Sequence, residues 1–252
     1  MTKQFCKLHY ITLLSLILAG IFLTTAAYLG WFMIEHLDRD ERKKSVELLR
    51  TVLQTTQESL HIWLKNHKYS IEEWASSPKL IALVEEQITV PKNRENLISS
   101  PILTSLRNFF RDQSHHDLKD FFIISPEHIN IASMQDANIG TKNLIAKQRN
   151  KHLLDAFQGK TLFIPPVVSD VPLTYLGKLT YHAPTMFVAT PIKDKNGQTI
   201  SVLAGRLSPD GPFSHIAQAG RVGMSGETYF FDKTGRLISN SRFSSSIQQT
   251  GL

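Results

Sequence analysis

The chain opens with an apolar run and continues with a helical and then a strand-like pattern. No residue in the range 10–34 is charged, and Lys3 and Lys7 precede it. This run is longer than the ~20 residues that a helix needs to cross a bilayer. It therefore predicts a transmembrane helix over residues 11–34.

The flanking charges orient this helix. Basic residues beside a membrane span tend to remain in the cytoplasm. This places residues 1–10 inside and everything after Ile34 outside, as in a single-pass protein of the cytoplasmic membrane. The alternative is a signal peptide cleaved near Thr25–Ala27, although the apolar run continues beyond the usual length of such a peptide. Both interpretations export the remainder of the chain.

A long amphipathic helix is predicted to follow the apolar run. Its apolar residues recur at intervals of three and four, which places them on one stripe. Such a stalk can pair with its copy in a homodimer, or the part after Leu53 can pack on its own domain. Breaks at 76–78, 90–92 and 99–101 divide the rest of a stalk and helical region that we place at 35–117. The stripe consists of Val46, Leu49, Leu53, Thr56, Leu60 and Trp63.

Two strand-turn-strand patterns follow one another near the end of the chain. The first joins 186–190 to 199–207, and the second joins 227–231 to 236–240. Both turns read Asp-Lys-x-Gly, and glycine at the last turn position supplies the positive φ that such hairpins need. We therefore expect two β-rich units in tandem.

The range 121–133 has the same shape as these hairpins, with an apolar run, a polar turn and then alternation. We therefore expect a complete α+β lobe over 118–219 and an incomplete second lobe over 220–252. The second hairpin would lack the sheet it should join, so its apolar side chains should be exposed. These side chains are Tyr229, Phe230, Phe231, Leu237 and Ile238.

The segment between the two strand pairs of the first lobe combines a helix with a long loop. The range 142–159 is predicted to be helical and to stop at Gly159. The loop that leads to Pro184 has no periodicity but contains Tyr175 and Tyr181. Loops of this length are usually functional or disordered, and the aromatic residues argue against disorder.

Composition and charge exclude several classes of protein. The chain has 252 residues, of which 42% are hydrophobic and 20% are charged, far from the composition of disordered proteins. The net charge of +6 is spread along the chain, without the basic and aromatic cluster that nucleic-acid binding requires. The only cysteine is Cys6, so no intramolecular disulfide is possible.

The motifs that suggest catalysis or metal binding are incomplete. The range 223–226 lacks the second glycine of a nucleophile elbow, because Glu227 stands in its place. His115 and His116 are neighbours and lack the spacing of metal ligands. Glycines 220, 223 and 226 lack the Gly-x-Gly core of a dinucleotide loop. We expect no catalytic residue, no metal and no cofactor, and hence no enzyme.

Several motifs together resemble the double Cache extracytoplasmic sensor domains of bacterial signalling proteins. Their order matters most: a membrane helix, a long helix that ends near Trp74–Pro78, and a series of strand motifs in which the last two are the most specific. The resemblance covers essentially residues 34–252. The strand motifs are 165–170, 184–191, 203–209, 220–232 and 235–243.

This resemblance implies an α+β fold in which a transmembrane helix continues into a stalk and then into PAS-like antiparallel-sheet lobes. It also implies a small-molecule pocket in the membrane-distal lobe, the lobe we place at 118–219. Two departures stand out. Most of the second lobe and any kinase, cyclase or chemotaxis output would be missing after Leu252, and the residue arrangement of the amino-acid-binding subgroup is absent.

Arg206 is the strongest candidate for binding a ligand. Strand alternation places it on one face with Val202 and Ala204, and its planar guanidinium suits a carboxylate. The alternative is a structural ion pair, for example with Asp170 or Asp136. Thr190 is a second candidate from a strand face. The family's pocket is roofed by the loop before its third strand, which adds Tyr175, Tyr181 and Asp170 as candidates.

The sequence therefore predicts a membrane-anchored extracytoplasmic sensor of a small, anionic molecule that lacks its output domain. An anchored dimerisation or interaction module without a ligand is the first alternative. An inactive remnant of a disrupted sensor gene is the second.

Overall fold

The computed structural model describes residues 2–113, 118–221, 226–232, 235, 237–241 and 243, without the side chains of 2–15, 38 and 119. It divides into two compact units, Met1–Val52 and Leu53–Leu252. The motifs at His115–His116 and 223–225, and the strand start at Arg236, lie outside the described residues.

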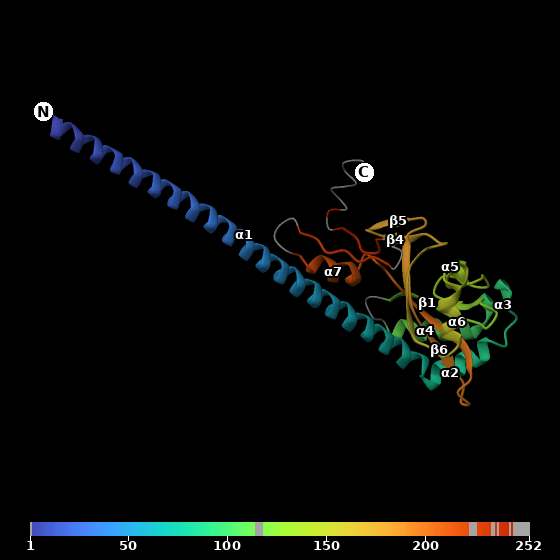
Figure 1. Cartoon of the computed structure of the whole chain (residues 1–252). Helices are drawn as coiled ribbons and strands as arrows, with labels where there is room; N and C mark the ends of the chain where they lie inside the picture. Colours follow the sequence, from blue (N-terminus) through green and yellow to red (C-terminus); the bar gives the residue numbers. More distant parts are fainter. Residues whose placement is uncertain are drawn as a thin grey trace. The chain divides into compact units, whose positions relative to one another are not determined.

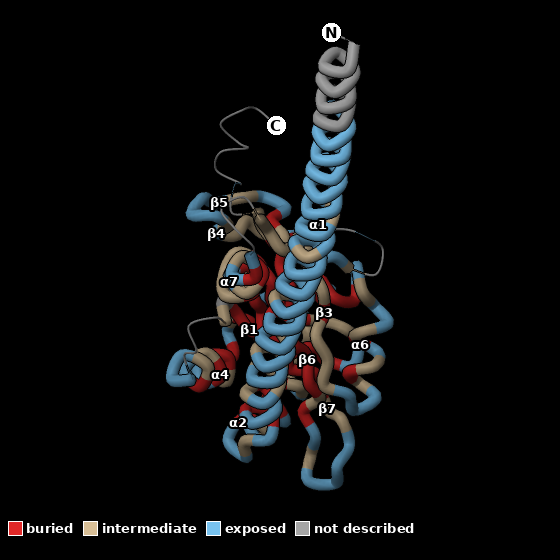
Figure 2. The backbone as a smooth tube through the Cα atoms, turned by 60° about the vertical axis from the view of Figure 1, so that its left-hand side comes forward, coloured by how far each residue is buried: buried red, intermediate tan, exposed pale blue. Residues whose placement is uncertain are grey.

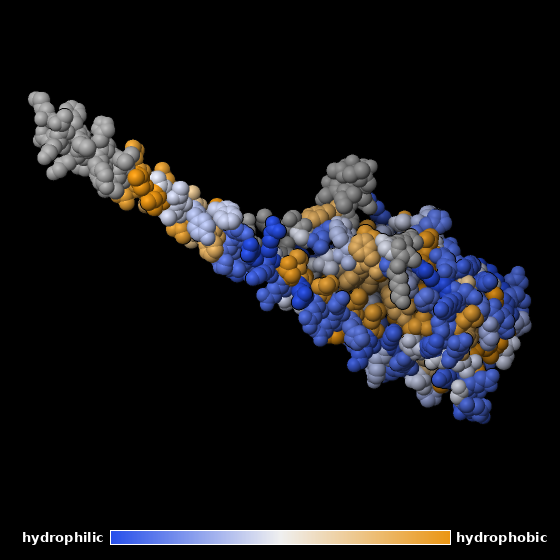
Figure 3. Space-filling view, in the orientation of Figure 1, coloured by the Kyte–Doolittle hydropathy of each residue, from blue (hydrophilic) through white to orange (hydrophobic). Residues whose placement is uncertain are grey.

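The first unit belongs to one helix, α1, which spans Thr2–Ala75. This helix contains a stretch that is long and apolar enough to cross a membrane. The described side chains from Leu16 to Ile34 are exposed, and their apolar part is orange in Figure 3. A helix with exposed apolar side chains on all sides is typical of a segment that faces lipid.

The second unit is α+β, as the sequence predicts. A five-stranded antiparallel sheet has the order β2-β1-β7-β6-β3 (Figure 1). Its strands are β1 Leu118–Ile124, β2 Asn130–Ser133, β3 Leu162–Val168, β6 Pro184–Lys193 and β7 Thr199–Leu207. The predicted strand pairs at 121–133 and 186–207 are thus confirmed as β1–β2 and β6–β7. Gly197 and Gly235 both have positive φ, as their turns require.

Short helices begin at or just after the positions where the sequence predicts helix breaks. Pro78 and Pro101 each stand in the first turn of a helix. A backbone N–H in this turn has no carbonyl partner within the helix, so a proline, which lacks the N–H, costs no hydrogen bond there. The side chains of Asn93, Ser100 and Asn143 accept hydrogen bonds from the first backbone amides of their helices. The helices are α2 Pro78–Gln87, α3 Arg94–Ser99, α4 Pro101–Asp112, the 3-10 helix η1 Asp136–Asn138, α5 Leu144–Gln148, α6 Asn150–Phe157 and α7 Pro212–Ala219.

The two faces of the sheet pack against different helices. Phe121, Ile123, Met186, Val188 and Leu203 belong to one apolar cluster with residues of α1, α2, α3, α4 and α7. Phe122, Ile124, Phe187, Val202 and Ala204 belong to another, with residues of α5 and α6. We call these the α1 face and the α6 face. The buried positions in Figure 2 concentrate on these strands and on the inner sides of the helices.

The stripe on α1 divides at Leu53. Val46, Leu49 and Leu53 are exposed, whereas Thr56 is buried and Leu60 and Trp63 pack on the cluster of the α1 face. Packing on its own domain is therefore confirmed for the part of the stripe after Leu53.

The loop before β6 is not as irregular as the sequence indicates. It contains a small antiparallel hairpin of β4 Leu173–Tyr175 and β5 Lys178–Thr180. Leu176 and Gly177 turn the chain with positive φ, which suits a two-residue hairpin turn. The sequence did not predict this hairpin, because strands of three residues are too short to show an alternating pattern.

The C-terminal hairpin agrees with the prediction only in part, since Tyr229, Phe231 and Leu237 are exposed as expected. Among its described residues the structure has one isolated bridge, between Phe231 and Leu237, and no strand. Phe230 and Ile238 are not exposed as expected but pack on the cluster of the α1 face, and the ring of Phe230 lies 5.1 Å from that of Phe213. These contacts bury part of the apolar surface of this segment.

Candidate functional site

A cavity of about 500 Å³ lies beside the β4–β5 hairpin and the ends of β6 and β7. This volume is within the range of small-molecule sites. Its wall is mixed: Pro172, Leu173, Leu179 and Leu207 are apolar, whereas Arg206 and Asp120 carry ionisable groups.

Arg206 projects from β7 on the α6 face. Its neighbours across the sheet are Asp120 on β1 and Phe187 on β6. The guanidinium carbon lies 4.9 Å from the ring centre of Phe122 and 5.7 Å from that of Phe187. Aromatic faces attract a cation, and this attraction grows when water is excluded. The two rings therefore position the guanidinium.

The guanidinium of Arg206 is buried without a hydrogen-bond partner. The residue is 1% exposed, and Nε, Nη1 and Nη2 have no partner among the described residues. Burial lowers the pKa of Arg206, and the negative charges of Asp120 and Asp170 oppose this shift. Arginine nevertheless stays protonated in proteins, so the cavity contains a cation whose donors are unused.

Asp120 is the acid that most affects Arg206, but its own oxygens are already engaged. Its Oδ1 accepts hydrogen bonds from the backbone amides of Phe121 and Met134, at 2.8 and 3.0 Å, and Ser133 Oγ donates to the same carboxylate. Burial raises the pKa of Asp120, and Arg206 and these hydrogen bonds oppose the rise. The carboxylate thus balances part of the charge without bonding to the guanidinium.

The β4–β5 hairpin is held over the cavity at two points. Asp210 Oδ2 accepts a hydrogen bond of 2.8 Å from the amide of Leu176. The hydroxyl of Tyr175 donates to Asn240 Oδ1 in the C-terminal segment, and burial raises the pKa of Tyr175. Tyr175 also borders a smaller cavity of about 260 Å³ beside that segment.

The structure brings Arg206 and Tyr175 to the same cavity but not the other three predicted residues. Tyr181 is 71% exposed and is not part of the wall. Thr190 has the strand parity of Val188 and Ile192, which face α1, and its hydroxyl pairs with Thr161 Oγ1 at 2.8 Å. Asp170 forms an ion pair of 3.1 Å with Lys147 and acts on Arg206 only through its charge.

The ion-pair alternative for Arg206 does not take the expected form. Asp136 pairs with Arg107 and Asp170 with Lys147, so both acids named from the sequence have other partners. The sequence analysis missed Asp120, Phe122 and Asp210. A strand that begins with an acid followed by an apolar run was a signal for Asp120, but only the register shows that it faces Arg206.

The comparisons with known proteins found structural likeness alone. No family model matches the chain, and no curated protein matches it. Among solved structures, 58 chains match. One is the sensor domain of E. coli DcuS, with 16% identity and a TM-score of 0.42, covering 64% of this chain and 96% of that one.

Two others are domains of chemoreceptors. The ligand-binding domain of the Pseudomonas aeruginosa amino acid chemoreceptor PctC, in complex with GABA, has 13% identity and a TM-score of 0.42, covering 78% of this chain and 74% of that one. The sensory domain of Campylobacter jejuni Tlp3, with isoleucine bound, has 15% identity and a TM-score of 0.38, covering 81% and 75%. The function proposed below rests on the residues of this chain.

Proposed function

We propose that this chain is a membrane-anchored extracytoplasmic sensor region that binds a small carboxylate beside Arg206. The observation that carries this proposal is the buried guanidinium without a hydrogen-bond partner. A buried donor without a partner costs about 1–3 kcal/mol, and more when it is charged. A carboxylate supplies two acceptors in the geometry of the guanidinium fork.

The other residues of the cavity wall and its volume indicate the size and polarity of the ligand. Its apolar residues favour a ligand with an apolar body, and its volume of about 500 Å³ limits that body to a small molecule. Asp120 and Asp210 already accept hydrogen bonds from the chain, so they offer little to a ligand cation. A monocarboxylate with an apolar body fits these properties.

The topology of the proposal comes from the first unit. Lys3 and Lys7 would keep the N-terminus in the cytoplasm, and the apolar part of α1 would anchor the chain. The binding unit would then be periplasmic or otherwise extracytoplasmic. The exposed apolar residues Val46 and Leu49 favour pairing of two copies through the stalk.

Thermal unfolding of the full chain in detergent tests the ligand. Benzoate, acetate and succinate are compared with their neutral amides as matched controls. A ligand that binds only the folded state stabilises it by about 2.7 kcal/mol at a hundred times its dissociation constant. We expect at least one carboxylate, and none of the amides, to raise the midpoint.

Two arginine variants make the test specific. Arg206→Lys keeps the charge but loses the fork, so the affinity for the carboxylate should fall more than about tenfold. Arg107→Lys is the control, because Arg107 bonds to Asp136 and to the carbonyl of Ser133 outside the cavity. It should lower stability but leave the response to the carboxylate intact.

The opposite result would favour an interaction module without a ligand. If no carboxylate shifts the midpoint and Arg206→Lys lowers the stability of the ligand-free protein, Arg206 forms a structural pair with Asp120. The site proposed here would then be wrong.

A further inference from the structure

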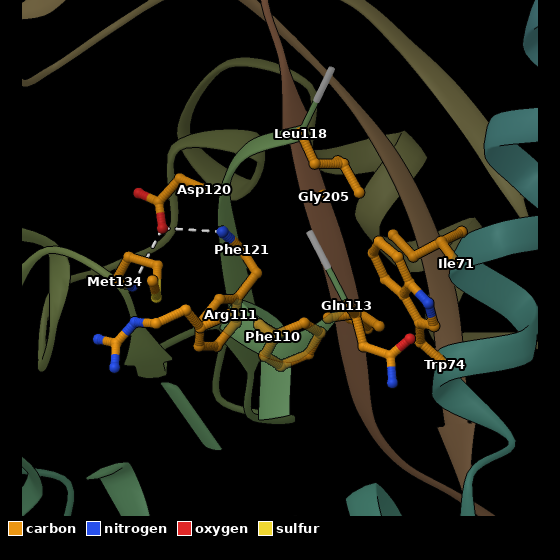
Figure 4. Close-up of a pocket in the computed structure, with 11 residues that line it drawn as sticks. Ile71, Trp74, Phe110, Arg111, Gln113, Leu118, Asp120, Phe121, Met134 and Gly205 are labelled. Carbon is orange, nitrogen blue, oxygen red and sulfur yellow. Dashed lines mark hydrogen bonds between the residues drawn. The ribbon is translucent and has the colours of Figure 1, made fainter. Parts of the chain in front are cut away.

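Another cavity lies on the α1 face of the sheet, between α1, α4 and the start of β1 (Figure 4). Its volume is about 210 Å³. Asp120 borders both this cavity and the one beside Arg206. In Figure 4 its carboxylate points away from the aromatic rings, toward the backbone of Met134. We call the cavity on the α1 face the apolar cavity.

Three aromatic rings form much of its wall. The rings of Phe110 and Phe121 stack with their centres 3.9 Å apart, and Trp74 meets Phe110 edge-on at 6.1 Å. Ile71 lies beside Trp74 on α1, and Leu118 lies next to Gly205 on β7. A Cβ at Gly205 would lie only 2.6 Å from Leu118 Cδ2, so the missing side chain leaves room for the leucine and the hollow beside it.

Water is a poor partner for the inner wall of this cavity. A buried water needs two to four polar partners, and the polar side chains of Arg111 and Gln113 belong to exposed residues of the lining. Asp120 accepts hydrogen bonds from two backbone amides, and Arg111 Nη1 donates to Asn108. Among the described lining residues there is no buried polar atom without a partner.

The rings of the wall lack packing partners on the side that faces the cavity. Protein interiors are close-packed, and a void costs the dispersion contacts of the atoms that line it. A dry cavity of about 150 Å³ lined by aliphatic and aromatic residues is known to hold benzene. The cavity here is somewhat larger, at about 210 Å³, and its rings can meet a further ring edge to face.

We propose that the apolar cavity binds one small, neutral, aromatic molecule of the size of a substituted benzene. This site is separate from the carboxylate site and does not rest on it. The two sites differ in the charge they select, because one has an unpartnered cation and the other has a wall made mainly of aromatic and aliphatic side chains.

Fluorescence of Trp74 provides a direct test. The chain has three tryptophans, and the variant Trp31→Phe/Trp63→Phe keeps only the one in the wall of the apolar cavity. Bromobenzene is the probe, since its heavy atom quenches an indole only at contact. We expect saturable quenching in the full-length protein in detergent, and none from 4-bromobenzoate at the same concentration.

Matched Leu→Phe variants locate the probe. Leu118→Phe places a ring in the apolar cavity and should weaken bromobenzene binding by about tenfold or more. Leu179→Phe makes the same change in the wall of the other cavity and should leave binding unchanged. Gly205→Ala is a second filling variant, because its Cβ would push Leu118 into the hollow.

Two results would overturn the proposal. Quenching that rises linearly without saturation would show that the probe only partitions into detergent. Equal saturable quenching in Leu118→Phe, Gly205→Ala and Leu179→Phe would place the probe elsewhere. Thermal unfolding of each variant identifies a failure to fold, and the remaining filling variant then decides the outcome.

Discussion

The two faces of the sheet bury different kinds of side chain. On the α1 face, buried apolar side chains such as Ile123 and Leu203 meet α1 and α4. On the α6 face, Arg206 is as deeply buried as these residues, yet its guanidinium has no hydrogen-bond partner among the described residues. Adjacent residues on one strand, Phe122 and Ile123, thus face environments of opposite character.

This difference is the basis of the site that we propose. A core without charges needs no explanation beyond the hydrophobic effect. A buried cation without a bonded partner works against stability, and in the function proposed above a bound carboxylate would supply that partner. Both faces contain a cavity, and the chemistry of each wall distinguishes the ligands that we propose.

The largest expected effect comes from placing a charge on the apolar face. Ile123→Lys would bury an ammonium group where no acid accompanies it in the cluster, at 0% exposure. The free energy of unfolding should fall by about 4 kcal/mol or more. Urea denaturation measures the change, and Ile123→Leu is the control, with a cost below about 1.5 kcal/mol. A similar cost for both variants would show that water reaches this face.

A smaller loss of stability is expected from removing a side chain of the C-terminal segment that packs on the α1 face. Phe230 packs on Phe213, whereas its neighbour Phe231 is 58% exposed. Because Phe230 is only partly buried, Phe230→Ala should lower the free energy of unfolding by about 2 kcal/mol, and Phe231→Ala by less than about 0.5 kcal/mol. Thermal unfolding of both variants checks this. Equal small effects would mean that the segment does not support the first lobe.

Much of the fold could be predicted from periodicity. The apolar run within α1, the pair β6–β7 and the helix starts at Pro78 and Pro101 depend on local patterns that one window of sequence contains. The hairpin β4–β5 could not be found in this way, since its strands are three residues long. The packing of Phe230 on Phe213 could not be found either, since it joins distant segments.

The candidate site was predictable only in part, for a similar reason. Arg206 stands out because a charge in an apolar strand is rare. Its pairing with Asp120 depends on the register of β1 against β7, which a single sequence does not show. Thr190 was chosen from a strand face without knowing which helices cover that face, and its parity places it with Val188 on the α1 side.

Removing the cation from the α6 face should have a small effect on stability. Arg206→Met replaces the guanidinium by an apolar side chain of similar length between Phe122 and Phe187. The variant removes the cost of burying an unpartnered cation, whereas Asp120 loses the attraction of the guanidinium but keeps its hydrogen bonds to Phe121, Met134 and Ser133. These two effects oppose each other, so we expect the free energy of unfolding to change by less than about 1 kcal/mol. The response to carboxylates should disappear. A loss of more than about 2 kcal/mol would instead indicate a structural role.

The smallest effect concerns the charge of Asp120. Its pKa in the folded protein is raised above 3.8, chiefly by burial, with Arg206 opposing the rise. The folded state therefore binds this proton more tightly than the unfolded state. The resulting stability is fully present below pH 3.8 and is lost as the pH rises through the folded-state pKa.

Asp120→Asn isolates this contribution, because its amide oxygen can still accept from Phe121 and Met134. The free energy of unfolding of the wild type, minus that of the variant, should decrease as the pH rises through this window. Glu127 acts in the opposite direction, since its hydrogen bond with Lys92 lowers its pKa to about 2, but this contribution cancels in the difference between wild type and variant.

At neutral pH the Asp120→Asn variant should also bind benzoate more tightly, by less than about tenfold, because one negative charge at the cavity wall is gone. Denaturation over a pH series and calorimetric titration measure the two effects. A difference that rises with pH, together with weaker benzoate binding, would show that Asp120 supports Arg206 as a structural partner and does not compete with the ligand.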